Sequence, residues 1–186
     1  MAGERTLYRK LQVILDYAKE GKHSDIGTLV AYVLKHKPTN FIYYYRDRST
    51  DEVKRGYSES SVERTIEVLT DLMLLSPGDL SLTKRGVAAT DPGRFPGIVG
   101  KGVTRFLEGR GIPLESILET IKVILRAESP RPPTATEIWE KLGLPEDSEE
   151  SEDSIDAKAF RQMMSLLGQC EVIYMTQRRI YLPLTE

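Results

Sequence analysis

Basic and aromatic side chains stand next to each other in residues 38–57, PTNFIYYYRDRSTDEVKRGY. The run Phe41-Ile42-Tyr43-Tyr44-Tyr45 has strong β propensity and predicts a short strand. Its cationic neighbours are Arg46, Arg48, Lys54 and Arg55. This combination suits nucleic acid, because cations contact phosphates and aromatic rings stack on bases. Alternatively, Phe41, Tyr43 and Tyr45 pack against the domain while the charges are solvated, and the two interpretations can coexist.

A second candidate group lies at the start of an amphipathic helix that begins near residue 58. Ser60 and Glu63 have the spacing of a capping box, although Ser58 could cap the helix instead. The N-terminal residues that we expect to be exposed are Ser60, Ser61, Arg64 and Thr65. If this helix entered a DNA major groove, Arg64 could bind guanine in a bidentate manner, which is worth about 1–3 kcal/mol of discrimination. The alternative is that Arg64 pairs with Glu63 or Glu67 on the helix surface.

The segment 58–90 resembles the recognition helix and wing of the winged helix-turn-helix superfamily. Ser60-Ser61-Val62-x-Arg64 is similar to the start of that recognition helix, and Leu82-Thr83-x-x-Gly86 is similar to the strand end and turn that follow the wing. Many members carry Gly just after the recognition helix, where Met73 stands in this chain. The resemblance implies DNA binding, with a wing whose cations either touch phosphates or are solvated. These cations are Lys84 and Arg85.

The order helix, helix, helix, hairpin is predicted twice along the chain. In the first half, two helices with apolar stripes precede the helix that starts near residue 60. In the second half, a similar pattern starts at residue 114 and ends in a hairpin formed by residues 172–175 and 180–182. The resemblance therefore implies two tandem winged-helix domains, mainly α with small β-hairpin wings (α+β). It covers residues 6–90 and 114–184.

These patterns predict two domains and a connector. The first domain, residues 1–90, carries the insertion 38–57 between its second and third helices. Residues 91–113 are rich in glycine and predict a connector, with a pattern that allows a short helix. The second domain, residues 114–186, contains an acidic low-complexity loop at 145–154.

The charge balance differs between the two halves. Residues 1–113 hold 18 Lys and Arg against 14 Asp and Glu, whereas residues 114–186 hold 8 against 14. The acidic half matches a phosphate backbone poorly, and its resemblance to paired winged helices implies a protein contact or a homodimer. Its candidate contacts are Lys158, Arg161, Arg178 and Arg179. The acidic loop either covers these cations or a basic partner, or is a solvated linker.

The sequence lacks the residue patterns that would indicate an enzyme, a metal- or cofactor-binding protein, or a membrane protein. Cys170 is the only cysteine, and His23 and His36 are the only histidines. We therefore expect no zinc site, no other cofactor and no enzyme. Trp139, the sole tryptophan, either packs in a core or anchors a partner. No apolar run is long enough to span a membrane, and the N-terminus lacks a signal-peptide core, so we expect a cytoplasmic protein. We therefore expect a DNA-binding transcription regulator or the DNA-engaging subunit of a larger complex, or alternatively a protein-interaction module.

Overall fold

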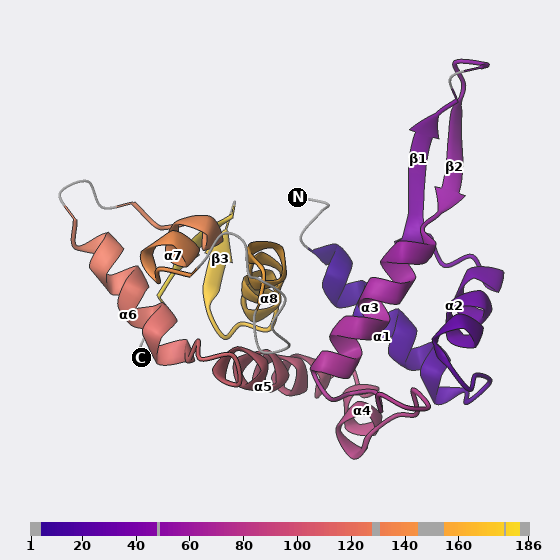
Figure 1. Cartoon of the computed structure of the whole chain (residues 1–186), viewed down its shortest axis with the longest axis horizontal. Coiled ribbons are helices and arrows are strands. Elements are labelled where there is room, and N and C mark those ends of the chain that lie inside the picture. The colour runs from indigo at the N-terminus through magenta and orange to yellow at the C-terminus, as the bar shows by residue number, and fades with distance from the viewer. Residues whose placement is uncertain (1–4, 48, 128–130, 145–154, 177, 183–186) are drawn as a thin grey trace. The chain divides into compact units, whose positions relative to one another are not determined.

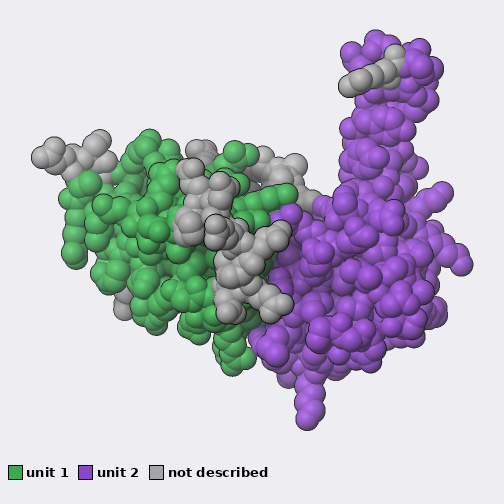
Figure 2. Space-filling view, in the orientation of Figure 1, with its two compact units in different colours: residues 1, 96–186 green, residues 2–95 purple. Residues whose placement is uncertain are grey.

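A computed structural model describes residues 5–47, 49–127, 131–144, 155–176 and 178–182. Helices make up most of these residues, and the β structure among them consists of two antiparallel hairpins and one isolated bridge. The predicted mainly helical α+β class is therefore confirmed. The chain divides into an N-terminal unit, residues 2–95, and a C-terminal unit, residues 96–186 (Figure 2). Over the described ranges, no helix is both long and apolar enough to cross a membrane.

Helices α1 (Arg5–Lys19), α2 (Ile26–Lys35) and α3 (Glu59–Asp71) pack together in the N-terminal unit (Figure 1). Asp25 caps α2 with a capping box that it forms with Thr28. Ser58, and not Ser60, caps α3, because the Ser58 side chain accepts a hydrogen bond from the Ser61 backbone. The apolar stripes of the three helices are buried and include Leu11, Ile14, Leu15, Leu29, Val33, Val62, Ile66 and Leu69.

Helix α3 ends in a Schellman motif. The backbone N–H of Leu74 donates to the carbonyl of Leu69 at 2.8 Å, and the N–H of Met73 donates to the carbonyl of Thr70 at 2.8 Å. Met73 consequently adopts a left-handed backbone conformation with φ +56, at the place where the resemblance expects glycine. The next two residues, Leu74 and Leu75, turn back into the core and are buried.

The wing expected after α3 is reduced to one antiparallel bridge between Leu75 and Leu82. The chain then enters helix α4 (Lys84–Ala89). Lys84 and Arg85 therefore lie in the first turn of a helix, and the prediction that they belong to a wing was wrong. Lys84 is exposed, whereas Arg85 is half-buried and makes an interaction of its own.

The Leu82-Thr83-x-x-Gly86 sequence has a structural explanation. The Thr83 hydroxyl caps α4 by accepting from the Gly86 N–H at 3.0 Å, and it donates to the carbonyl of Met73 at 2.8 Å. Gly86 lies directly against the Leu74 carbonyl, since a Cβ added at residue 86 would stand 2.0 Å from that oxygen. Only glycine allows α4 to approach the end of α3 this closely.

The insertion forms a β-hairpin between α2 and α3. A short 3-10 turn, η1 (Thr39–Phe41), leads into β1 (Ile42–Arg46), which pairs with β2 (Val53–Tyr57). The predicted strand is thus confirmed, but the hairpin of this unit precedes the third helix, and the expected order helix, helix, helix, hairpin was wrong here. Of the three aromatic residues that were expected to pack on the domain, Phe41 is buried, whereas Tyr43 and Tyr45 are exposed.

Residues 91–113 contain a helix of 14 residues, α5 (Phe95–Glu108), where the sequence predicted a connector with a possible short helix. Val99 and Val103 on this helix are fully buried. Gly100 lets the helix pack closely on the chain after α8, because a Cβ added there would lie 2.8 Å from Val172 Cγ2. The glycines that suggested a linker therefore include one that is needed for helix packing.

The rest of the C-terminal unit follows the predicted order of elements. Helices α6 (Leu114–Leu125), α7 (Ala135–Lys141) and α8 (Ala157–Gln169) precede the hairpin of β3 (Tyr174–Thr176) and β4 (Arg179–Tyr181). Trp139 is buried and its ring centroid lies 5.2 Å from that of Phe160, so it packs in the core. The predicted acidic loop, 145–154, lies outside the described residues.

Candidate nucleic-acid interface

The β1–β2 hairpin extends beyond the helices of the N-terminal unit as a narrow ribbon (Figures 1 and 2). Its antiparallel register places Tyr44 opposite Arg55 and Arg46 opposite Val53. Because directly opposed residues lie on the same side of a two-stranded sheet, these four lie on one face, which we call the Tyr44 face. The half-buried pair Ile42 and Tyr57 continues the same face toward η1 and α3. Most of the strand residues on the ribbon are exposed.

The Tyr44 face combines an open aromatic ring with two cations. The Tyr44 side chain is 71% exposed, and among the described residues it contacts no other ring. Arg55 forms no ion pair within the described part of the chain. Arg46 Nη1 lies 3.5 Å from Asp51 Oδ1, but both side chains are well exposed, and such a pair contributes little. Both arginines can therefore turn toward an external anion.

The opposite side of the ribbon, the Tyr43 face, is occupied by contacts within the hairpin. The rings of Tyr43 and Tyr45 lie 5.7 Å apart with an interplanar angle of 33°. Tyr43 also covers Gly56, since a Cβ added at residue 56 would come within 2.7 Å of its ring. Lys54 pairs with Asp47 at 2.5 Å. The predicted phosphate contact at Lys54 therefore competes with an ion pair that is already formed.

Asp47 organises the hairpin turn. Besides the Lys54 ammonium, its carboxylate accepts hydrogen bonds from the Ser49 hydroxyl and the Ser49 backbone N–H. These contacts, with Lys54 the largest cause, lower the pKa of Asp47 to about 2. The hydrogen bond that the Ser49 N–H donates to the Asp47 carboxylate is that of an Asx turn, a signal that could have predicted this connection from the sequence. Arg48, another predicted contact, lies outside the described residues.

The start of α3 departs from the prediction of a base-reading surface. Thr65 is 2% exposed and its hydroxyl donates to the Ser61 carbonyl, so the prediction that it is exposed was wrong. The Ser61 hydroxyl accepts from Lys10 Nζ at 2.6 Å. Arg64 is half-buried and has an interaction of its own. Of the four predicted residues, only Ser60 is exposed.

Acidic side chains surround this part of α3. A shallow depression of about 540 Å³ lies at the base of the hairpin. Its lining residues are Tyr43, Tyr57, Ser58, Glu59, Ser60 and Glu63. Glu59 is exposed and Glu63 is half-buried, and the two carboxylates would repel phosphate groups. The hairpin is therefore a better candidate for nucleic-acid contact than the helix.

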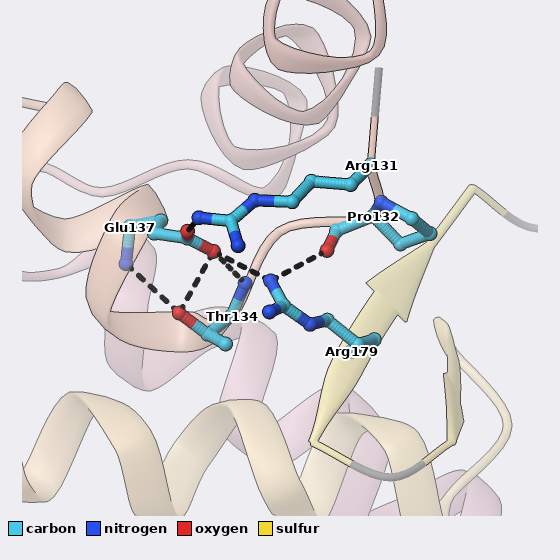
Figure 3. A network of polar contacts seen from close by, with 5 residues as sticks. All are labelled: Arg131, Pro132, Thr134, Glu137 and Arg179. Carbon is cyan, nitrogen blue, oxygen red and sulfur yellow. Dashed lines mark hydrogen bonds and ion pairs between the residues drawn. The ribbon is translucent and has the colours of Figure 1, made fainter. Parts of the chain in front are cut away.

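In the C-terminal unit, Arg179 belongs to a structural network (Figure 3). Its Nη1 donates to the Pro132 carbonyl at 3.0 Å and pairs with Glu137 Oε2 at 3.0 Å. Glu137 also pairs with Arg131 and accepts from the Thr134 N–H at 2.7 Å within a capping box. The bond from the Thr134 backbone is the first cause that lowers the pKa of Glu137. Arg179 thus ties β4 to the start of α7, which argues against its predicted contact with DNA.

The other predicted contacts of this unit are exposed but are not organised into a site. Lys158 and Arg161 lie on the exposed side of α8, and Arg178 is exposed in the β3–β4 turn. The described residues contain no group of His, Cys, Asp and Glu that could hold a metal ion. Burial raises the pKa of the Cys170 thiol to about 12, so this thiol is protonated at neutral pH.

Comparisons with protein-family models, curated proteins and solved structures gave no match. The resemblance of the sequence to the winged helix-turn-helix superfamily therefore stays a prediction. In the C-terminal unit the hairpin follows α8, the last of the three helices α6–α8, as that superfamily would have it, whereas in the N-terminal unit a single bridge follows α3.

Proposed function

We propose that this chain binds DNA through the Tyr44 face, as a transcription regulator or as the DNA-engaging subunit of a larger complex. The observation that carries the proposal is the exposed pair of Tyr44 and Arg55, with Arg46 beside them, on a projecting ribbon. Phosphates satisfy the two guanidinium groups, and the ring covers a base or sugar.

The exposure of the ribbon supports a role in binding. An isolated two-stranded hairpin is only marginally stable in water. This one leaves Tyr44 and Val53 exposed by 71% and 67%. Apolar side chains on a projecting element bury their surface only when a partner covers them. Two arginines on the same face make an anionic partner favourable.

The predicted contacts outside the hairpin have supporting roles in this proposal. Ser60 and Lys84 are exposed on the same unit and can add contacts to the DNA backbone. Arg64, which was predicted to read base edges, is half-buried and has an interaction within the chain. In the C-terminal unit, Lys158, Arg161 and Arg178 are exposed and can contact DNA or a protein.

Fluorescence anisotropy across a salt series tests the proposal. The two phosphate contacts of the hairpin should contribute about −1.8 to the slope of the logarithm of duplex affinity against the logarithm of salt concentration. A double Arg46→Gln, Arg55→Gln variant should therefore make this slope shallower by about 1.8. Lys101→Gln, which removes an exposed cation of α5, is the matched control and should behave like the wild type. No binding at low salt by the wild type would refute the proposal.

A protein-interaction module is the second candidate. The exposed apolar groups on the hairpin, above all Val53 and the two rings of Tyr43 and Tyr45, favour it. Such a surface would bind a protein partner or a second copy of the chain with little dependence on salt. Sedimentation velocity without DNA, at low and high salt, distinguishes the two functions. A concentration-dependent dimer that survives high salt and is lost in Val53→Lys would support the protein interface.

A further inference from the structure

We infer that the Tyr44 face selects nucleic acid with unpaired bases, as in single-stranded DNA or the open part of a junction, over intact duplex. The inference rests on the proposed function, because it specifies the form of nucleic acid that the same site binds. Three observations lead to it: the state of the hairpin rings, the placement of the two arginines, and the surface of α3.

Tyr44 is the ring of the hairpin that is open to a stacking partner. Tyr43 lies over Gly56, and Tyr45 lies beside Tyr43, so these two rings already cover each other and the ribbon backbone. Tyr44 is on the opposite face and contacts no other ring in the described part of the chain. An exposed aromatic ring stacks on any base, irrespective of sequence.

The stacking partner must be a base that is not already stacked. In an intact duplex each base lies between its neighbours, and inserting a side chain requires a step to be unstacked and the helix to be kinked. A single strand presents its bases without that cost. One tyrosine on a slender hairpin, with few other contacts to compensate for unstacking, therefore favours unpaired bases.

The arginines lie where they can follow a single strand past the ring. Arg55 is directly opposite Tyr44 in the ladder, and Arg46 is two residues from Tyr44 on the same strand, a separation of about 7 Å. Both project from the Tyr44 face. A strand that stacks one base on Tyr44 can consequently place the adjoining phosphates on the two guanidinium groups.

The surface of α3 provides little of what a duplex would need. A recognition helix docks exposed polar residues from its N-terminal turns into the major groove. On α3, Thr65 is buried and Ser61 is hydrogen-bonded to Lys10. Glu59 and Glu63 would bring negative charge close to the DNA if α3 entered a major groove. Duplex DNA would thus gain phosphate contacts from the hairpin but little from the helix.

Anisotropy with three labelled ligands of about 15 nucleotides tests the inference: oligo-dT, oligo-U and a mixed-sequence duplex. At equal salt, oligo-dT should bind on the order of 10-fold more tightly than the duplex. Tyr44→Val, which retains a strand-forming residue, should weaken oligo-dT binding by on the order of 5- to 100-fold and leave duplex binding nearly unchanged. Tyr45→Val, on the opposite face, is the matched control and should leave both affinities near those of the wild type.

The outcomes separate this inference from the proposed function. Duplex binding as tight as oligo-dT binding would overturn the selectivity but leave DNA binding in place. No binding to any ligand would overturn both. An unchanged oligo-dT affinity in Tyr44→Val, with hairpin amide shifts confirming that the ribbon is folded, would also overturn the inference. Comparable binding of oligo-dT and oligo-U would support the inference, because a ring stacks on either base. A preference of about 10-fold for oligo-U would overturn the assignment to DNA.

Discussion

Glu137→Ala should destabilise the C-terminal unit more than its surface position suggests. The substitution removes one half of the capping box with Thr134, which costs about 0.5–1 kcal/mol. It also removes the charge-assisted contact with the half-buried guanidinium of Arg179, which costs about 1.5 kcal/mol more. The pair with the exposed Arg131 adds little. The expected loss is therefore about 2–2.5 kcal/mol of unfolding free energy.

Trp139 provides the assay. It is the only tryptophan, it is buried in the C-terminal unit, and it packs on Phe160, so its fluorescence follows the unfolding of that unit. In urea, with a denaturant dependence of about 1 kcal/mol per molar, the midpoint should fall by about 2 M. Glu140→Ala on the same helix is the matched control, because Glu140 is exposed and makes no ion pair with another described residue.

Two further variants identify which part of the network acts. Glu137→Gln keeps a side chain that can complete a capping box but removes the charge, so it should lose only about half as much stability. If Arg179 is the partner, Arg179→Ala should add little in the Glu137→Ala background. Because the pKa of Glu137 is lowered in the fold, its contribution is present above its ordinary value of 4.5 and is lost as the pH falls below it. A midpoint for Glu137→Ala equal to that of Glu140→Ala would refute the reasoning.

Four further outcomes are expected. Met73→Gly should stabilise the N-terminal unit by about 0.5–1 kcal/mol in thermal unfolding, because φ +56 is strained for a side-chain-bearing residue; a lower midpoint would contradict this. Gly86→Ala should destabilise the same unit by about 2 kcal/mol or more, since the new Cβ clashes with the Leu74 carbonyl, and an unchanged midpoint would show that the contact relaxes freely. The Cys170 thiol, with its pKa raised to about 12, should resist alkylation at neutral pH until urea unfolds the chain, and rapid labelling of the native protein would argue against its burial. Because the pKa of Asp47 is lowered to about 2, its carboxylate should stabilise the hairpin turn above about pH 4 and lose this effect as the pH falls toward 2. The measurement is the NMR shift of the hairpin amides as a function of pH. Amide shifts that stay constant over that range would contradict the expectation.

The elements that sequence reasoning predicted correctly are those that local signals determine. Helix α2 starts at Asp25 because its side chain satisfies a backbone N–H within the same turn. Helix α7 starts at Thr134 for the same reason, with Glu137 completing the box. The apolar spacing of α1, α6 and α8 likewise acts over one or two turns, so each was recognisable without knowledge of its neighbours.

The elements that were missed depend on contacts between residues distant in the sequence. Residues 91–113 were predicted to be a connector that allows a short helix, but not the 14-residue helix α5, because the sequence did not show that Val99 and Val103 have a core to pack against or that Gly100 is needed for the approach to Val172. Burial of that face outweighs the weak helix propensity of its glycines. The same limit applied to the hairpin: β propensity predicted β1, but it could not show that Tyr43 would cover Gly56 of the other strand.

The two units share a backbone feature at the ends of α3 and α8, the helices that precede the Leu75–Leu82 bridge and the β3–β4 hairpin. Glu171 after α8 has φ +60, and the Val172 N–H donates to the Leu167 carbonyl at 2.9 Å. This is the Schellman geometry that Met73 adopts after α3, again followed by two apolar residues. Two units that end this helix in the same strained way, without glycine, support a common supersecondary plan.

If the plan is common, the chemical difference between the units lies in the connection that precedes α3 in the N-terminal unit and α8 in the C-terminal unit. In the N-terminal unit that connection carries the aromatic and basic residues of the hairpin, and in the C-terminal unit the same connection contains the acidic sequence 145–154. The hairpin arginines attract a phosphate backbone, whereas the carboxylates of the acidic sequence repel it. The hairpin should therefore provide the main contacts with an anionic ligand, and the double variant Arg46→Gln, Arg55→Gln should lose most of the DNA affinity even with Lys158 and Arg161 intact.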